Sequence, residues 1–345
     1  MPDRFLIVSP NWLGDAVMAL PALQDVRRQF PGARLAVAAR PAVAGLFALV
    51  PGVDDVVTLR WRGHVLQRRE VAADTDALRA VSAEVALLFP NSFATAWLVK
   101  QAGIPARWGY AADFRSRLLT RAVPRPHGVH QGAYYQNLTT ALGITPGPLQ
   151  PEVMVSRDAL AIARALLREH GWDPARRLVV LAPGAAYGTA KRWLPAHFAD
   201  LITRVVRDRQ ADCVLVGSGG DAETIAMITA ALSADARAHT IDLAGRTTLE
   251  LLTAVLALAA ACVSNDSGAM HLAAAAGAPL AALFGPTRDR ETAPLARTGR
   301  ADVLINPVWC RPCMLRECPI DHRCMRGLTP ARVAASVAAL MERPS

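Results

Sequence analysis

Aromatic and charged residues are scarce in this chain of 345 residues, and no apolar run in it is long. Aromatic side chains make up 6 % and charged ones 19 %, whereas 52 % of the residues are hydrophobic. This composition excludes an intrinsically disordered chain and predicts a core of small aliphatic side chains. The longest apolar runs, residues 251–263 and 272–284, are shorter than the roughly 20 residues that a membrane-spanning helix needs.

A secretion signal is also lacking. The N-terminal apolar stretch is interrupted by Asn11 and Asp15, and no cleavage pattern follows it. We therefore expect a cytoplasmic protein that meets a membrane, if it does, from the side. The net charge of +9 implies an anionic partner, which is a nucleic acid, an acidic membrane surface or a phosphorylated substrate. The alternative is that the positive charge reflects a general preference for arginine over lysine and indicates no partner.

The cysteines fall into two groups. Cys213 and Cys262 lie in apolar runs, which indicates buried core thiols. The others crowd together near the C-terminus with Cys-x2-Cys-x4-Cys-x5-Cys spacing, at Cys310, Cys313, Cys318 and Cys324. Such a cluster in a cytosolic chain is metal-binding or reduced rather than disulfide-bonded. Its spacing matches no common zinc motif closely, and we expect no metal here.

Short apolar runs alternate with helical patterns along the whole chain, which predicts parallel sheets covered by helices on both faces. A Pro- and Gly-rich stretch at residues 146–151 marks a domain boundary, after which the pattern restarts. We expect an α/β protein with two Rossmann-like domains whose parallel sheets face a central cleft. The domains are residues 1–150 and 151–328, and a C-terminal helix in residues 329–345 packs back on the first.

The loop after the first predicted strand, residues 9–15, is one candidate site. It opens a helix at the carboxyl end of a strand, which is where ligands bind in open α/β sheets. Asp15 in this loop either caps the helix or serves as a general base.

Three further candidate sites follow strands of the second half. Residues 183–193 place small residues before Lys191 and Arg192, as a diphosphate-binding loop does, although the Walker pattern is absent. Residues 216–223 form a Gly-rich turn in which Glu223 either holds ribose or favours the start of the next helix. Residues 264–271 begin a helix behind two cap residues, and His271 is a ligand contact or a packed core histidine.

Five segments together resemble the lipopolysaccharide heptosyltransferases of glycosyltransferase family 9. They are LIVSPNWLGDAVMALPAL (6–23), PNSFATAWLVKQAGIPARWGY (90–110), KRWLP (191–195), SNDSGAMHLAAA (264–275) and CPIDHRCM (318–325). Within the family, the second and fifth segments are more similar to heptosyltransferases II than to heptosyltransferases I. The resemblance implies a GT-B fold, an inverting mechanism, no cofactor and no catalytic metal, with ADP-heptose as the donor.

The resemblance also implies roles for individual residues. Asp15 is the general base. The donor is held by Thr189, Lys191, Glu223, Asp266, Ser267, Gly268 and His271, with Lys191 neutralising the diphosphate, Glu223 on ribose, and Asp266 on heptose hydroxyls or orienting its loop. Hydroxyl residues that some relatives carry before the lysine are replaced by Ala186 and Tyr187, so phosphate contacts fall to Thr189 and backbone amides.

The acceptor that the resemblance implies is an anionic glycolipid, heptosyl-Kdo2-lipid A, at the inner face of the cytoplasmic membrane. It explains the basic balance without a nucleic-acid partner. We expect it to meet residues of the first domain, namely Asn11, Arg60, Arg62, Arg115 and Arg117. The alternatives are heptosyltransferase I or another family 9 transferase, a sugar-nucleotide epimerase of similar architecture, and a nucleotide- or metal-binding module that uses the cysteine cluster.

Overall fold

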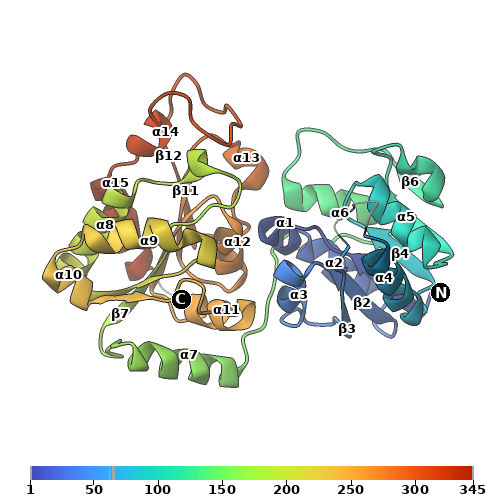
Figure 1. Cartoon of the computed structure of the whole chain (residues 1–345), viewed down its shortest axis with the longest axis horizontal. Helices are drawn as coiled ribbons and strands as arrows, with labels where there is room; N and C mark the ends of the chain where they lie inside the picture. The colour runs from blue at the N-terminus through green and yellow to red at the C-terminus, as the bar shows by residue number, and fades with distance from the viewer. Residues whose placement is uncertain (1, 62, 64–66, 344–345) are drawn as a thin grey trace. The chain divides into compact units, whose positions relative to one another are not determined.

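The chain forms two compact units, Met1–Met154 and Val155–Ser345, in a computed structural model that describes residues 2–61, 63 and 67–343 (Figure 1). Each unit has a six-stranded, fully parallel sheet, in the order β3-β2-β1-β4-β5-β6 and β12-β11-β10-β7-β8-β9. When the strands are numbered within each unit, both orders are 3-2-1-4-5-6, the order of Rossmann-type domains. The expected pair of Rossmann-like sheets is confirmed.

The first unit packs helices on both faces of its sheet. Helices α1, α2, α3 and α6 pack together on one face, whereas α4 and α5 share a core with Leu6, Val8 and Leu88 on the other. The elements are β1 (Arg4–Val8), α1 (Leu13–Met18), α2 (Leu20–Gln29), β2 (Arg34–Ala39), α3 (Pro41–Phe47), β3 (Asp55–Thr58), α4 (Arg68–Ala80), β4 (Val85–Leu88), α5 (Phe93–Gln101), β5 (Ala106–Tyr110), η1 (Arg115–Leu118), β6 (Arg121–Val123) and α6 (Gln131–Ala141).

The second unit repeats the arrangement. Helices α7, α11 and α12 pack together, as do α8, α9, α10 and α15. The elements are α7 (Arg157–Glu169), β7 (Arg177–Ala182), η2 (Thr189–Lys191), α8 (Pro195–Arg209), β8 (Ala211–Leu215), η3 (Gly219–Asp221), α9 (Ala222–Ala230), α10 (Ala234–Ala238), β9 (Thr240–Asp242), α11 (Leu249–Ala257), β10 (Ala261–Asn265), α12 (Gly268–Ala275), β11 (Leu280–Phe284), α13 (Asp289–Thr292), β12 (Ala301–Ile305), α14 (Arg323–Arg326) and α15 (Pro330–Glu342).

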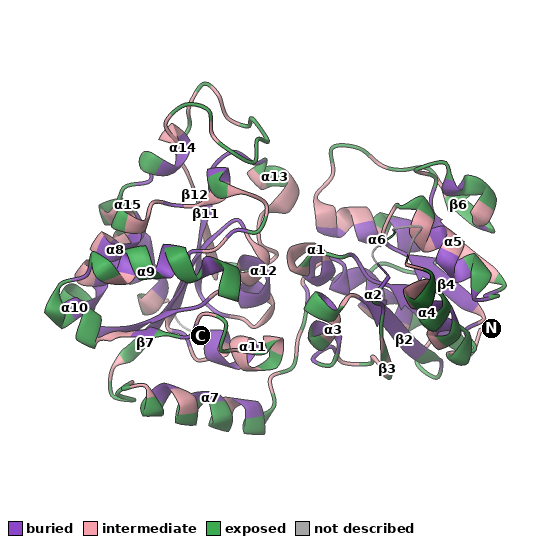
Figure 2. Cartoon of the chain, viewed as in Figure 1, coloured by how far each residue is buried: buried purple, intermediate pink, exposed green. Residues whose placement is uncertain are grey.

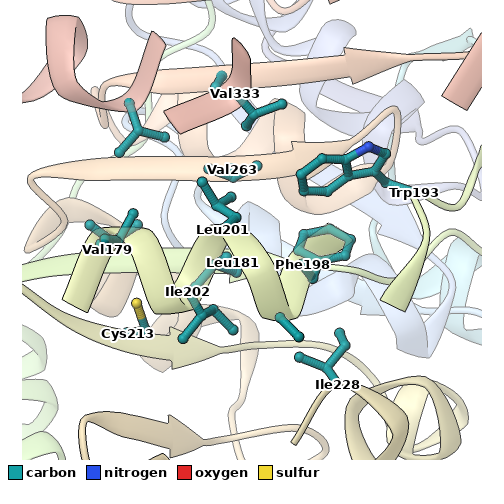
Figure 3. Close-up of a cluster of buried hydrophobic side chains, with 14 of the residues drawn as sticks. Val179, Leu181, Trp193, Phe198, Leu201, Ile202, Cys213, Ile228, Val263 and Val333 are labelled. Atoms are coloured by element: carbon teal, nitrogen blue, oxygen red, sulfur yellow. The ribbon is translucent and has the colours of Figure 1, made fainter. Parts of the chain in front are cut away.

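The core of the second unit is aliphatic, as the composition predicts, but it includes two aromatic rings. Trp193 and Phe198 are fully buried, and their ring centroids lie 4.9 Å apart (Figure 3). Burial follows the sheets and the inner faces of the helices in both units (Figure 2). No helix of the described residues is long and apolar enough to cross a membrane.

The first helical segment is divided at Ala19 into α1 and α2, because Pro21 has no N–H to continue the hydrogen-bond ladder. The C-terminal helix α15 is part of the second unit, and its expected packing on the first unit stays a prediction. Val333 and Val337 of α15 are fully buried in the core of the second unit, together with Phe198.

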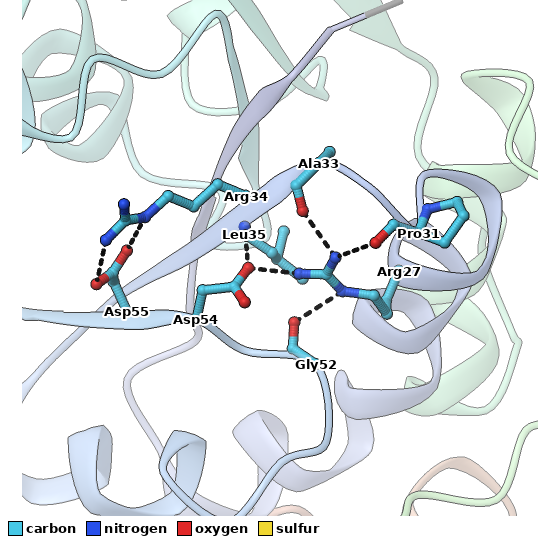
Figure 4. Close-up of polar contacts among 8 residues, drawn as sticks. All are labelled: Arg27, Pro31, Ala33, Arg34, Leu35, Gly52, Asp54 and Asp55. Carbon is cyan, nitrogen blue, oxygen red and sulfur yellow. Dashed lines mark hydrogen bonds and ion pairs between the residues drawn. The ribbon is translucent and has the colours of Figure 1, made fainter.

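An arginine holds the turns at the amino ends of strands β2 and β3 in the first sheet. Arg27, at the end of α2, donates to the carbonyls of Gly52 (2.8 Å) and Ala33 (2.7 Å) and to the Asp54 carboxylate (2.6 Å) (Figure 4). These bonds lie at the amino ends of the strands, so the carboxyl edge is left for the loops that carry the candidate sites.

Candidate functional site

The order of strands defines one binding position in each unit. After the neighbouring strands β1 and β4 of the first unit, the chain turns toward opposite faces of the sheet, and the same holds for β7 and β10 of the second unit. Ligands of open α/β sheets bind where this reversal occurs. The loops that follow these strands carry Asp15, Lys191 and Asp266. The structure therefore places the main predicted site residues at the two reversal points.

Asp15 lies in the first turn of α1 and does not cap it, because Trp12 holds the cap position. The Tyr135 hydroxyl of α6 lies 3.5 Å from Asp15 Oδ1 and donates to it. Burial, and then the charge of Asp15, raise the pKa of Tyr135 well above 10, so Tyr135 keeps its proton and remains a donor at neutral pH. The carboxylate is thus oriented by a buried phenol, as a positioned base must be.

Tyr134, next to Tyr135 in α6, is hydrogen-bonded at the carboxyl ends of β4 and β5. The Asn91 side chain, in the loop after β4, donates to the Tyr134 hydroxyl at 2.7 Å, and the Tyr110 hydroxyl donates to the Tyr134 carbonyl at 2.6 Å. Phe89 packs against Tyr135 with ring centroids 5.2 Å apart. These contacts fix α6 against the loops of β4 and β5, and so fix Tyr135 beside Asp15.

Arg115 corrects an expectation. Its side chain is 0 % exposed, so it is not placed to contact an acceptor directly. The guanidinium donates to the carbonyls of Tyr110 (3.0 Å) and Pro90, and burial lowers its pKa to about 10, which leaves it charged at neutral pH. Gly109 makes room for it, because a Cβ there would lie 2.9 Å from Arg115 Nη2. Arg115 supports the loops after β4 and β5.

The other predicted acceptor residues are at the surface. Asn11, Arg60 and Arg117 are exposed, and Asn11 Oδ1 accepts a long hydrogen bond of 3.4 Å from Arg40 Nε. Arg62 lies outside the described residues. Their contact with an acceptor stays a prediction.

In the second unit, the loop after β7 is tied to the end of β10 by one buried amide. The Asn265 side chain accepts a hydrogen bond from Trp193 N (3.0 Å) and donates to the Pro183 carbonyl (2.7 Å). It therefore binds both ends of the loop. The predicted loop of residues 183–193 therefore lies against the predicted site at residues 264–271.

This arrangement pairs Lys191 with Asp266. Lys191 Nζ lies 2.6 Å from Asp266 Oδ2, and the Thr287 hydroxyl donates to the same oxygen at 2.6 Å. The lysine also lies over the Tyr187 ring, 4.8 Å from its centroid. The ammonium is held at the strand ends by one carboxylate and one aromatic face.

The remaining predicted donor residues differ in exposure. Thr189 and Glu223 are exposed, at the starts of η2 and α9. Ser267 and Gly268 open α12, where backbone N–H groups and the helix dipole favour an anion. His271 is buried, at 4 % exposure. A pocket of about 360 Å³ beside the loop is lined by Thr189, Arg192, Trp193, Leu194, Pro195, Thr224, Asp321, His322 and Arg326.

The segment that carries the four clustered cysteines, residues 310–324, contacts the loop of residues 183–193. Cys310, Cys313, Cys318 and Cys324 line one small pocket with Ala190. Ala190 N donates to the Arg316 carbonyl at 2.9 Å, and Gly188 leaves room for that backbone, since a Cβ there would lie 2.2 Å from Arg316 O. Among the described residues, no group of three or more His, Cys, Asp or Glu side chains is arranged to hold a metal ion.

The sequence assigns no role to Tyr135 or Thr287, whereas Asn91 and Tyr187 lie in predicted segments without a stated contact. Thr287 follows β11 and could have been found by the same rule that found Asp266, because both lie just beyond a strand end. Tyr135 lies in the middle of α6, and no local pattern distinguishes it.

Two parallel sheets of Rossmann order in one chain form the architecture of the GT-B fold. The family model described as glycosyltransferase family 9 (heptosyltransferase) matches residues 72–323. The chain belongs to this family.

Individual relatives cover the whole chain. It is 30 % identical to lipopolysaccharide heptosyltransferase 2 of Escherichia coli K12, over 98 % of each chain. It is 28 % identical to lipopolysaccharide heptosyltransferase 1 of Pseudomonas aeruginosa, over 99 % of each. The solved structure of E. coli ADP-heptose LPS heptosyltransferase II superposes with a TM-score of 0.84 at 28 % identity, over 98 % of each chain.

Proposed function

We propose that this chain transfers L-glycero-D-manno-heptose from ADP-heptose to the first heptose of the lipopolysaccharide inner core, on heptosyl-Kdo2-lipid A. The observation that carries the proposal is the similarity to E. coli lipopolysaccharide heptosyltransferase 2 over 98 % of the chain. The site agrees with it, because a cationic loop and a helix N-terminus at the second reversal point suit a nucleotide diphosphate.

Transfer proceeds with inversion. Asp15 removes the proton from the acceptor hydroxyl as that oxygen attacks the anomeric carbon from the face opposite ADP. The bond to the diphosphate oxygen breaks, and its electron pair leaves with ADP. Tyr135 holds the Asp15 carboxylate in its orientation through the hydrogen bond of 3.5 Å.

Charge on the leaving diphosphate is neutralised by the protein, so no metal ion is required. Lys191 supplies the ammonium, and the amides that open α12 add their dipole. Asp266 keeps Lys191 extended at the strand ends and leaves it when the phosphates bind, because a carboxylate in contact with a diphosphate would be repelled. Thr189 contacts the phosphates, and Glu223 contacts the ribose.

The enzyme works in the cytoplasm, peripheral to the inner membrane, where its glycolipid acceptor is exposed. Its net charge of +9 suits an anionic acceptor in an anionic leaflet.

Product analysis with two acceptors tests the function. With ADP-heptose and EDTA, we expect heptose transfer to heptosyl-Kdo2-lipid A and little to Kdo2-lipid A. Turnover with Kdo2-lipid A alone would assign the chain to heptosyltransferase 1, a candidate that the similarity to the P. aeruginosa enzyme keeps open. Interconversion of the sugar nucleotide without transfer would identify an epimerase and refute the proposal.

A further inference from the structure

The phenyl ring of Phe114 is almost fully in solvent. It is 98 % exposed, the largest fraction for any large apolar side chain among the described residues. Its φ is 55°, and that of Asp113 is 47°. Left-handed backbone is unfavourable for residues other than glycine, and most of all for bulky ones. Aspartate tolerates this conformation, but Phe114 does not, so the loop holds this ring outward against a local cost.

Contacts on both sides keep the loop in that conformation. The Asp113 carboxylate accepts a hydrogen bond of 2.6 Å from Phe93 N, at the start of α5. On the other side, the buried guanidinium of Arg115 is fixed to the carbonyls of Tyr110 and Pro90. The exposure of Phe114 is therefore built into the fold, and the η1 turn that follows it is largely exposed apart from Arg115 (Figure 2).

The segment that carries Phe114 is cationic. Arg117 and Arg125 are exposed, and no carboxylate of the described residues lies within ion-pair distance of either guanidinium. Arg121 is engaged elsewhere, because its guanidinium lies over the Trp108 ring and donates to the Leu142 carbonyl at 3.1 Å. Asp113 is the one acidic residue of positions 106–125, and its carboxylate is already engaged by Phe93 N. The segment thus presents one apolar ring amid unpaired positive charge.

We propose that Phe114 inserts into an anionic lipid bilayer while Arg117 and Arg125 bind the headgroups. An aromatic ring that projects from a surface without a facing wall lacks the concavity of a sugar or small-molecule site. It does fit a soft planar surface, in which a ring enters the interface and flanking cations meet anionic headgroups. This inference rests on the proposed function for the choice of membrane, since the acceptor is a membrane glycolipid.

Vesicle sedimentation tests the inference with Phe114→Asn, because asparagine tolerates the left-handed backbone. Met227→Gln removes an exposed apolar side chain, 56 % exposed, from α9 of the second unit and is the matched control. We expect Phe114→Asn to bind phosphatidylcholine–phosphatidylglycerol vesicles about tenfold more weakly than wild type and Met227→Gln to bind normally. Arg117→Gln combined with Arg125→Gln should also weaken binding and reduce its dependence on salt.

Two further readouts complete the test. The Tm of Phe114→Asn should equal or exceed that of wild type, and its activity on a core acceptor without acyl chains should be unchanged. Unaltered vesicle binding, a lowered Tm, or an equal loss of activity on the acyl-free acceptor would overturn the inference, the last by placing Phe114 on the sugar. Vesicle binding needs no turnover, so loss of the proposed function alone would leave it standing.

Discussion

Lys191 Nζ and Asp266 Oδ2 are 2.6 Å apart although they belong to loops after two different strands, and their side chains are only 14 % and 5 % exposed. The pair is formed because Asn265 ties the loop of β7 to the end of β10. It brings the partly buried ammonium of Lys191 to the carboxyl ends of the strands, where ligands of such sheets bind. The other lysine of this arginine-rich chain, Lys100, is exposed.

Lys191→Met should therefore impair donor use. We expect kcat/KM for ADP-heptose to fall by about 10² or more, since a charge on the leaving diphosphate loses its partner. Lys100→Met removes the exposed lysine and should leave kcat/KM unchanged. Steady-state kinetics with varied ADP-heptose measure both, and equal activity of the two variants would refute the role of Lys191.

Tyr135→Phe should lower kcat about tenfold with little change in KM, because the Asp15 carboxylate loses the donor that orients it. That donor favours the ionised carboxylate, so its loss should move the acid limb of the pH–rate profile to higher pH. Tyr135 itself does not titrate in this range, since burial raises its pKa well above 10. A fall in kcat with an unmoved acid limb would indicate a structural role alone.

How far the sequence predicts this structure depends on burial. Central strands such as β1 and β4 are continuous apolar runs, which predict buried strands directly from the sequence. The edge strand β6 is three residues, Arg121–Val123, with an exposed arginine, and it has no apolar pattern to find. Likewise Asp15, Lys191 and Asp266 follow from strand ends, whereas Tyr135 reaches Asp15 only through the packing of α6.

Arg115 is a residue whose burial the sequence does not predict. A basic RSR turn indicates a solvated surface, yet Arg115 is buried in space that Gly109 leaves. Arg115→Met should destabilise the first unit by about 3 kcal/mol, because the carbonyls of Tyr110 and Pro90 stay buried without a charged donor. Urea unfolding measures this loss, and the exposed Arg117→Met is the control. Equal stability of the two variants would contradict the supporting role.

The cysteines should separate by reactivity. Burial raises the pKa of Cys262 to about 12 and that of Cys213 higher still, so neither is a thiolate near neutral pH. In the native protein, we expect iodoacetamide to label the exposed Cys313 first, and Cys213 and Cys262 only after unfolding. Mass spectrometry of peptides from timed labelling checks this order. Early labelling of Cys262 would show that its strand opens readily.

The central claim is that Asp15 is the base of a heptosyl transfer, and Asp15→Asn tests it most directly because it removes the charge and keeps the shape. With ADP-heptose, heptosyl-Kdo2-lipid A and EDTA, the account predicts that kcat falls by about 10³ or more, while the Kd for ADP measured by calorimetry is unchanged. Transfer by Asp15→Asn at a rate near that of wild type would contradict it.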